Sequence, residues 1–398
     1  MNLKKTFAAI AKKIKKNIKS ARLPQNPWPL VKATVIIIFV AVIAAEYFET
    51  RLVIPSDNIS NKVGQMLMVG FRGTAAPADS YIAKTIGELN LGGIILFDYD
   101  APSESRPRNI TDYDQTKKLV AELKNYSPNL PLLVAVDAEG GLINRLKPSM
   151  GFLYVPGAKE LGQNPAKAME DYWSLAAELA GLGFNINFAP VVDLDTNPEN
   201  PVIGALERSY SADPGIVVNL AKIMVAAHKS FGVITALKHF PGHGSSNSDS
   251  HLGLPDVTAT YSETELAPYE KLIKDGAAES IMTAHIINKN VDPDYPATLS
   301  PKFIQNILRD RLGFGGVVIS DDMQMGAIVD NYGFEDAIVL AINAGCDILV
   351  FSNNGKTYDE TMPYRAKDAI LKAVNDGRIS KERINQAYER ISSLKQGF

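Results

Sequence analysis

Eight short apolar runs constrain the fold of this chain more than any other feature. The segments between them have apolar residues at the spacing of an amphipathic helix. The runs cover residues 65–71, 92–97, 132–136, 185–192, 233–237, 280–284, 316–319 and 347–351. Predicted helices cover 112–125, 165–182, 213–231, 262–275, 301–311, 334–344, 364–376 and 380–395. Strands that alternate with helices pair in parallel through right-handed crossovers, and eight repeats favour a closed sheet over an open one. The sequence therefore predicts an α/β fold with a single (β/α)8 TIM-type barrel. Its first units are irregular, so an incomplete or partly reversed barrel is the alternative.

The segment before the first run differs in charge from the rest of the chain. Nine of the 41 Lys and Arg residues lie within 1–45, which hold no Asp or Glu, so 32 bases face 44 acids in the remainder. An acidic domain is a poor match for nucleic acid, which we do not expect as a partner. Residues 33–45 are apolar apart from Thr34, and Trp28 and Tyr47 flank them as interface residues flank a membrane span.

We interpret 1–32 as a basic cytoplasmic tail, 33–48 as an uncleaved transmembrane signal anchor, 49–60 as a linker and 61–398 as the barrel domain. A cleaved signal peptide is the alternative for the apolar segment, although the basic region is longer than is usual before such a peptide. Either interpretation places the barrel domain outside the cytoplasm, at the cell surface or in the periplasm, and cleavage would make it secreted. Cys346, the only cysteine, lies in an apolar run and is predicted to be buried.

Charged and imidazole side chains follow five of the eight predicted strands. They are Asp137 and Glu139 after the third run, Asp193 and Asp195 after the fourth, Lys238 and His239 after the fifth, His285 after the sixth, and Asp321 and Asp322 after the seventh. Active sites of barrels form at the carboxyl ends of their strands, so we expect these side chains to share one site. Carboxylates, a lysine and imidazoles suit a hydroxyl-rich ligand. No GxGxxG or P-loop motif follows a strand, and we expect no nucleotide cofactor.

Residues 238–255 concentrate three of the five histidines in one loop rich in Gly and Ser. Its glycines and prolines exclude a helix, so 245–250 is predicted to be a flexible polar segment that leads to Asp249 and His251. An Asp two residues before a His can hydrogen-bond the imidazole, fix its tautomer and raise its pKa. This arrangement is typical of a proton-transfer site, although Asp-Ser is also a common turn pair.

A metal site is a second interpretation of the same loop. His239, His243 and His251 with Asp249 are ligands of the right kind for zinc. We do not predict a metal, because the Pro and Gly residues break the helix that would place the first two histidines on one face, and no cysteine lies nearby.

Four motifs of this chain occur together in one known family. They are Lys-His-Phe-Pro-Gly-His-Gly at 238–244 with Asp-Ser-His at 249–251, Ile-Ser-Asp-Asp-Met at 319–323, Asp-Ala-Glu-Gly-Gly at 137–141 and Ile-Met-Thr-Ala-His at 281–285. The chain resembles glycoside hydrolase family 3, in its β-N-acetylglucosaminidase (β-N-acetylhexosaminidase) branch, over residues 60–395. The resemblance implies a retaining exo-enzyme that hydrolyses terminal β-linked N-acetylglucosamine through a covalent glycosyl-aspartate. It implies no cofactor, and we expect a monomer.

The resemblance also implies roles for individual residues. It assigns Asp321 as the nucleophile and Asp249 with His251 as a general acid/base dyad, and leaves Asp322 as a cap for a turn at 323–327. Contacts to the sugar fall on Asp137, Arg145, Arg208, Lys238 and His239. The chain departs from the family at Leu142, where relatives usually have Arg directly after Glu-Gly-Gly.

Two other functions remain open from the sequence. The same residues could transfer the sugar to phosphate, since a neutral acid/base tolerates an anionic nucleophile better than a carboxylate does. The barrel could also serve as a non-catalytic cell-wall sugar-binding protein held by its anchor. Export points to peptidoglycan or muropeptide fragments as the substrate, with chitin-derived oligosaccharides as the alternative.

Overall fold

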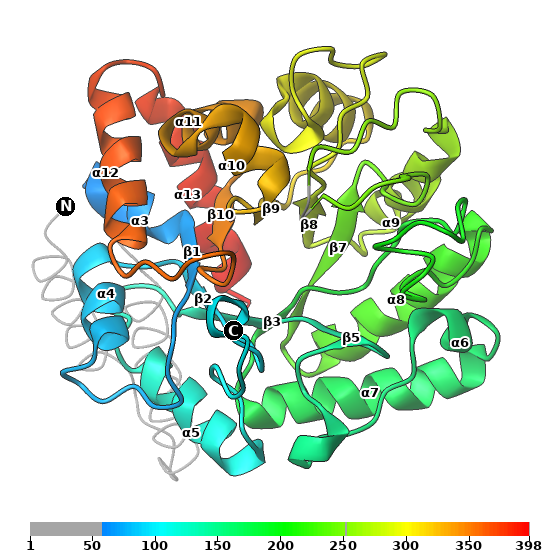
Figure 1. Ribbon diagram of the computed structural model, residues 1–398, viewed down its shortest axis with the longest axis horizontal. Helices are drawn as coiled ribbons and strands as arrows, with labels where there is room; N and C mark the ends of the chain where they lie inside the picture. The colour runs from blue at the N-terminus through cyan, green and yellow to red at the C-terminus, as the bar shows by residue number, and fades with distance from the viewer. Residues whose placement is uncertain (1–57, 251–252, 398) are drawn as a thin grey trace, which may run out of the picture. The chain divides into compact units, whose positions relative to one another are not determined.

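The computed structural model describes residues 58–250 and 253–397, which form a (β/α)8 barrel (Figure 1). The closed sheet has the strand order β1-β10-β9-β8-β7-β6-β3-β2, and every neighbouring pair is parallel. The strands are β1 (Leu67–Gly70), β2 (Gly93–Ile95), β3 (Leu133–Val136), β6 (Ile186–Asn187), β7 (Ile234–Phe240), β8 (Ser280–Thr283), β9 (Val317–Asp322) and β10 (Ile348–Phe351). Each overlaps one predicted run, so the closed barrel is confirmed and the partly reversed alternative is wrong.

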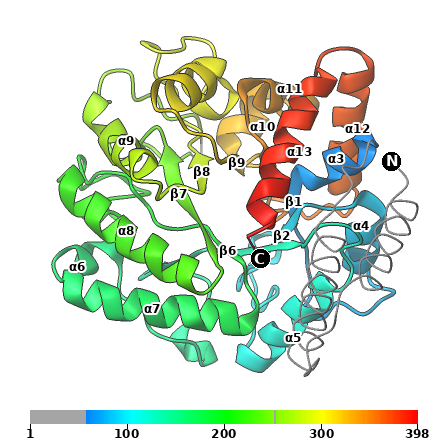
Figure 2. The same cartoon turned by 180° about the vertical axis from the view of Figure 1, so that it is seen from behind.

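Helices surround the strands, as the view from behind also shows (Figure 2). They are α3 (Ile59–Gln65), α4 (Tyr81–Leu89), α5 (Tyr113–Lys124), α6 (Ala158–Gly162), α7 (Pro165–Leu182), α8 (Pro214–Ser230), α9 (Ala267–Lys274), η5 (Lys302–Arg311), α10 (Gly326–Tyr332), α11 (Phe334–Ala344), α12 (Met362–Asn375) and α13 (Lys381–Lys395). Short 3-10 turns lie at η1 (Ala101–Ser103), η2 (Pro148–Met150), η3 (Glu263–Leu266) and η4 (Ala297–Leu299). The predicted helices are all present. Four short helices, α3, α4, α6 and α10, were not predicted as helices, because nine residues or fewer give little periodicity to detect.

Helix α7 shows why its residues begin and end a helix where they do. The Asn164 side chain accepts a hydrogen bond from the Lys167 amide, and Pro165 occupies the first turn, where no amide hydrogen is needed. Gly183 ends the helix with φ 91°, a conformation that costs glycine little. The helix packs against α8, which begins in the same way at Asp213 and Pro214.

The strands are buried on both faces, as parallel strands in a barrel must be. Every residue of β1, β2, β3 and β7 is buried. Cys346 is also buried, as predicted. At the end of β1, a Cβ on Gly70 would lie 1.9 Å from the Ser352 carbonyl oxygen, so only glycine allows this approach between the loops after β1 and β10.

Buried polar and charged groups lie at the amino end of the barrel, where the strands begin. Asp347, fully buried just before β10, accepts from Arg309, Arg383 and Arg390 at 2.8, 2.8 and 3.1 Å. Lys395, at the end of α13, donates from Nζ to Gly92 O at 2.7 Å. These contacts join the helices to the strand starts and leave the opposite end of the barrel open to a cavity.

A small hairpin interrupts the barrel after β3. Strands β4 (Ala138–Gly140) and β5 (Ile143–Asn144) pair in antiparallel fashion, apart from the barrel sheet. Leu142 lies in their turn and is 63% exposed. The hairpin was not predicted, and it leaves the parallel order of the barrel intact.

Within 58–250 and 253–397, no helix combines the length and the apolar character needed to cross a membrane. The predicted tail at 1–32 and signal anchor at 33–48 lie outside the described residues, as does most of the linker at 49–60. The division of the chain into tail, anchor, linker and barrel domain therefore stays a prediction. The compact unit that holds the barrel spans Ser56–Phe398.

Candidate active site

A cavity of about 740 Å³ opens at the carboxyl end of the barrel strands. Seven of the eight predicted site residues line it: Asp137, Arg145, Arg208, Lys238, His239, Asp249 and Asp321. The eighth, His251, lies outside the described residues. Apolar side chains, among them Phe97, Phe188 and Met282, form part of the remaining wall, next to further polar residues such as Gln324 and Asn354. The cavity thus joins charged groups with apolar surface, as sites for ring-shaped polar ligands do.

Lys238 connects two carboxylates at the floor of the cavity. Its Nζ lies 2.9 Å from Asp137 Oδ1 and 2.7 Å from Glu139 Oε1. Burial alone would raise the pKa of Glu139, but Arg208 and Lys238 lower it to about 2. The same lysine, with Arg145, keeps the pKa of Asp137 below its usual value against the effect of burial. All these groups are therefore charged at neutral pH.

Arg208 adds a second cation to this cluster. Its Nε and Nη2 donate to the two oxygens of Glu139 at 2.8 and 2.7 Å, a bidentate pair that fixes the guanidinium plane. Its Nη2 also lies 3.3 Å from His239 Nε2. Arg145 approaches the outer side of Asp137, with Nη2 3.6 Å from Oδ2. Ion pairs thus hold the guanidinium and carboxylate groups in fixed positions.

His239 is held between Asp193 and Arg208. Its Nδ1 lies 2.7 Å from Asp193 Oδ2, an acceptor, while Arg208 Nη2 is a donor facing Nε2. With a single ring hydrogen, His239 therefore carries it on Nδ1. Burial raises the pKa of Asp193, but the His239 ring and the amide of His243 outweigh this and lower it.

Glu139 and Asp193 were predicted as strand-end residues of the site, without individual roles. Both contact predicted site residues: Glu139 joins Lys238 to Arg208, and Asp193 orients His239. Their position directly after strands was the available signal. Asp195, which has the same signal, does not line the cavity.

The two aspartates at the end of β9 differ in their surroundings. Asp322 accepts from the amides of Gln324 at 3.1 Å and Ser352 at 3.0 Å, and from the Ser352 hydroxyl. It thus supports the turn after β9, as predicted, and also ties β9 to the loop after β10. Burial raises its pKa. Asp321 lines the cavity beside it.

The loop at 245–250 is partly packed, with Asn247 and Ser248 exposed, and its predicted flexibility stays a prediction. Ser245, Ser246 and Ser250 are buried, and the Ser246 hydroxyl donates to Ser248 O at 2.9 Å. The Ala327 amide, at the start of α10, donates to Ser250 O at 3.2 Å. Hydrogen bonds within the loop and to the start of α10 thus hold this segment, and Asp249 lies in the cavity wall.

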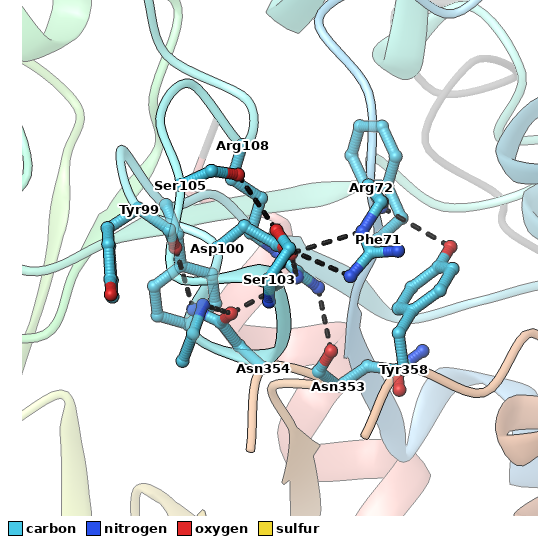
Figure 3. A network of polar contacts seen from close by, with 12 residues as sticks. Phe71, Arg72, Tyr99, Asp100, Ser103, Ser105, Arg108, Asn353, Asn354 and Tyr358 are labelled. Atoms are coloured by element: carbon cyan, nitrogen blue, oxygen red, sulfur yellow. Dashed lines mark hydrogen bonds and ion pairs between the residues drawn. The ribbon is translucent and has the colours of Figure 1, made fainter. Parts of the chain in front are cut away.

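A polar network holds the loops after β1, β2 and β10 together beside the cavity (Figure 3). Arg108 is fully buried and forms an ion pair with Asp100, and its Nη2 donates to Asn353 O at 2.8 Å. Arg72 lies over the Tyr358 ring at 4.5 Å. The sequence did not reveal this network. Its residues come from three distant segments and only meet once the barrel closes.

His285 does not line the cavity. It is buried, with Nδ1 2.8 Å from Thr298 Oγ1 and Nε2 3.0 Å from Asp322 O. The contact with Asp322 O supports the end of β9. No group of three His, Cys, Asp or Glu side chains among the described residues is arranged to hold a metal ion.

Known proteins with the same fold and motifs are enzymes that act on sugars. The model of the glycosyl hydrolase family 3 N-terminal domain matches residues 58–394. The chain is 31% identical over 372 residues to beta-hexosaminidase A of Pseudoalteromonas piscicida, covering 84% of this chain and 60% of the relative. It is 38% identical over 297 residues to a beta-hexosaminidase of Tolumonas auensis, covering 72% of this chain and 83% of the relative.

Solved structures give the same result. A family 3 β-N-acetylglucosaminidase from Paenibacillus sp. superposes with a TM-score of 0.77 at 39% identity, over 85% of this chain and 62% of that one. A β-N-acetylhexosaminidase from Beutenbergia cavernae has a TM-score of 0.75 at 28% identity, over 85% and 98%. The chain thus spans less than two thirds of some relatives and nearly all of others. With a family match over almost the whole barrel, the chain belongs to glycosyl hydrolase family 3.

Proposed function

We propose that this chain is a retaining exo-β-N-acetylglucosaminidase, which removes terminal β-linked N-acetylglucosamine by double displacement. The family match and the β-hexosaminidase and β-N-acetylglucosaminidase relatives support the reaction class. One observation carries the mechanism: the Ala327 amide donates to Ser250 O at 3.2 Å. This bond joins the loop that carries Asp249 to the helix that follows Asp321, and both carboxylates line one cavity.

The proposed first step forms a covalent intermediate. Asp321 attacks the anomeric carbon while protonated His251, stabilised by Asp249, donates its proton to the glycosidic oxygen. The bond to the aglycone breaks, and the sugar is left on the Asp321 oxygen with inverted configuration. In the second step neutral His251 takes a proton from water, which attacks the same carbon, releases Asp321 and restores the β configuration.

The ion-pair cluster supplies binding in this proposal. Asp137, Arg145, Arg208, Lys238 and His239 hold the ring hydroxyls. Since the contacts among them exist in the free protein, little side-chain entropy is lost when substrate binds. Donors that are fixed before the reaction are also more effective than mobile ones.

A chromogenic β-N-acetylglucosaminide tests the reaction class. We expect the chain to release the chromophore in phosphate-free buffer, with free N-acetylglucosamine as the sugar product. A requirement for phosphate, with sugar 1-phosphate as the product, would identify a phosphorylase instead. Binding of the sugar without any turnover would indicate the non-catalytic alternative.

Variants at His251 test the acid/base role. His251→Ala should lower turnover much more for substrates with poor leaving groups than for activated aryl glycosides, because only the former need a proton in the first step. Equal losses on both substrates would remove this residue from the acid role. Asp249→Asn should show the same pattern more weakly.

We further propose peptidoglycan or its muropeptide fragments as the natural substrate and a location outside the cytoplasm. The basic and apolar character of 1–48 in the sequence supports export. Incubation with muropeptides and with chitin oligosaccharides, followed by measurement of released N-acetylglucosamine, compares the two substrates. Recovery of the chain in the membrane fraction of its cells, exposed to external protease, tests the anchor.

A further inference from the structure

His243 stands apart from the other histidines in the described parts of the chain. It lines the cavity and is 3% exposed, yet within 58–250 and 253–397 neither of its ring nitrogens has a hydrogen-bond partner. His228 instead bonds Asn187 and Met224 O, and His239 and His285 also have a partner at each nitrogen. A buried polar group without a partner destabilises the fold and therefore needs an explanation.

A poorly fixed backbone does not explain why the ring nitrogens of His243 lack partners. The His243 amide donates to Asp193 Oδ1 at 2.8 Å, and its carbonyl accepts from Asn200 Nδ2 at 2.7 Å. The next residue is fixed too, since a Cβ on Gly244 would lie 1.8 Å from Leu194 O. The backbone is thus held on both sides, and the ring is presented to the cavity from a fixed position.

The ring lies among the groups assigned to the sugar and the nucleophile. Its edge packs against the His239 ring, with centroids 6.1 Å apart. Asp321 lines the same cavity. Burial lowers the pKa of the His243 ring to about 4, although the Asp193 carboxylate acts to raise it. The ring is therefore neutral at pH 7, with one donor nitrogen and one acceptor nitrogen.

We propose that His243 contacts the substrate directly, and that its ring hydrogen-bonds a hydroxyl or the acetamido group of the bound N-acetylglucosaminyl unit. This inference rests on the proposed function. Lys238 and Arg208 can only donate and Asp137 can only accept, whereas a hydroxyl or an amide does both. A neutral imidazole complements such a group, and substrate then satisfies the polar atoms that the protein leaves unpaired.

The test compares His243→Leu with His228→Leu, since both replace a buried neutral histidine. His243→Leu removes an unpaired polar group, so its melting temperature should equal or exceed that of the wild type, while kcat/KM falls about 10- to 100-fold. His228→Leu removes the hydrogen bonds of this ring to Asn187 and Met224 O and should melt earlier, with kcat/KM of the folded enzyme unchanged. His243→Gln, which can donate and accept, should recover part of the activity.

Substrate analogues distinguish a direct contact from an indirect effect. Aryl β-N-acetylglucosaminides that lack the 3-, 4- or 6-hydroxyl, and one without the acetyl group, are compared in wild type and His243→Leu. On the analogue that lacks the group contacted by His243, wild type and His243→Leu should have the same kcat/KM. A stable His243→Leu with wild-type kcat/KM would overturn the inference, as would an equal penalty on every analogue. A wild type without turnover would instead refute the proposed function.

Discussion

Replacing Asp193 by Asn should reverse the tautomer of His239. Asp193 Oδ1 accepts from the amides of His239 and His243 at 3.1 and 2.8 Å, and an asparagine oxygen can keep both contacts. The new NH₂ then occupies the place of Oδ2, which lies 2.7 Å from His239 Nδ1. Because that NH₂ is a donor, the ring must move its hydrogen to Nε2, where it faces the Arg208 donor at 3.3 Å.

The loss of unfolding free energy in Asp193→Asn follows from the hydrogen bonds that change. Loss of a hydrogen bond to a charged acceptor costs about 1.5–3 kcal/mol, and two opposed buried donors add about 1–2 kcal/mol. With an unfolding entropy of roughly 2.1 cal/mol/K per residue over Ser56–Phe398, the melting temperature should fall by roughly 3–7 °C. Because the folded pKa of Asp193 is lowered, its contribution is present at neutral pH and disappears as pH falls through that pKa.

Calorimetry and kinetics check this expectation. Asp195→Asn is the matched control, since the Asp195 side chain makes no hydrogen bond within the described residues, and it should melt within about 1 °C of the wild type. Asp193→Asn should also lower kcat/KM for an aryl β-N-acetylglucosaminide by roughly 10²-fold, because a catalytic site loses activity through small misplacements. ¹⁵N NMR of labelled histidine reports the tautomer directly. A variant with unchanged melting temperature and activity would refute the proposed role of Asp193.

Three further predictions address other parts of the chain. Asp321→Asn should abolish turnover while binding of N-acetylglucosamine persists, and wild-type-like rates would defeat its assignment as nucleophile. Glu139 has a pKa of about 2, lowered by Arg208 and Lys238 against the effect of burial, so its stabilisation is present above about pH 4.5 and lost as pH falls toward 2. Glu139→Gln should therefore be less stable at pH 6 and show a flatter loss of unfolding free energy in acid; an identical acid profile contradicts this. Burial lowers the pKa of Lys395 to about 7, so the unfolded chain binds a proton that the folded chain does not, and this group makes stability rise by about 1.4 kcal/mol per unit between pH 7 and 10. Lys395→Met should remove that slope in urea titrations, and a slope equal to that of the wild type would show that Lys395 stays protonated.

The barrel was predictable because its pattern is local. Each strand is a short run of apolar residues that is buried on both faces, such as Leu133–Val136, and α7 and α11 have the predicted ends. The lengths of strands were less predictable. Strand β7 extends through Phe240 because Lys238 and His239, although polar, are buried against ionic partners from other strands.

The partners within the site were not predictable, because they depend on closure of the barrel. Lys238 meets Asp137 across 101 positions of sequence, and Arg108 meets Asn353 across 245. The polar loop at 245–250 looked mobile because its hydrogen-bond partners, such as Ala327, lie far along the chain. Strand-end position identified some of the residues at the cavity, such as Asp137, Lys238 and Asp321, whereas Asp195 and His285 do not line it and Arg145, Arg208 and Asp249 came from the family resemblance. Only the folded chain shows which of these residues contact each other.

The stereochemistry of the first product tests the central claim most directly. A double displacement through Asp321 inverts the anomeric carbon twice, so proton NMR during hydrolysis of an aryl β-N-acetylglucosaminide should show β-N-acetylglucosamine first, with the α anomer appearing only by mutarotation. If the α anomer appears first, water attacks the substrate directly, and the covalent role of Asp321 is wrong.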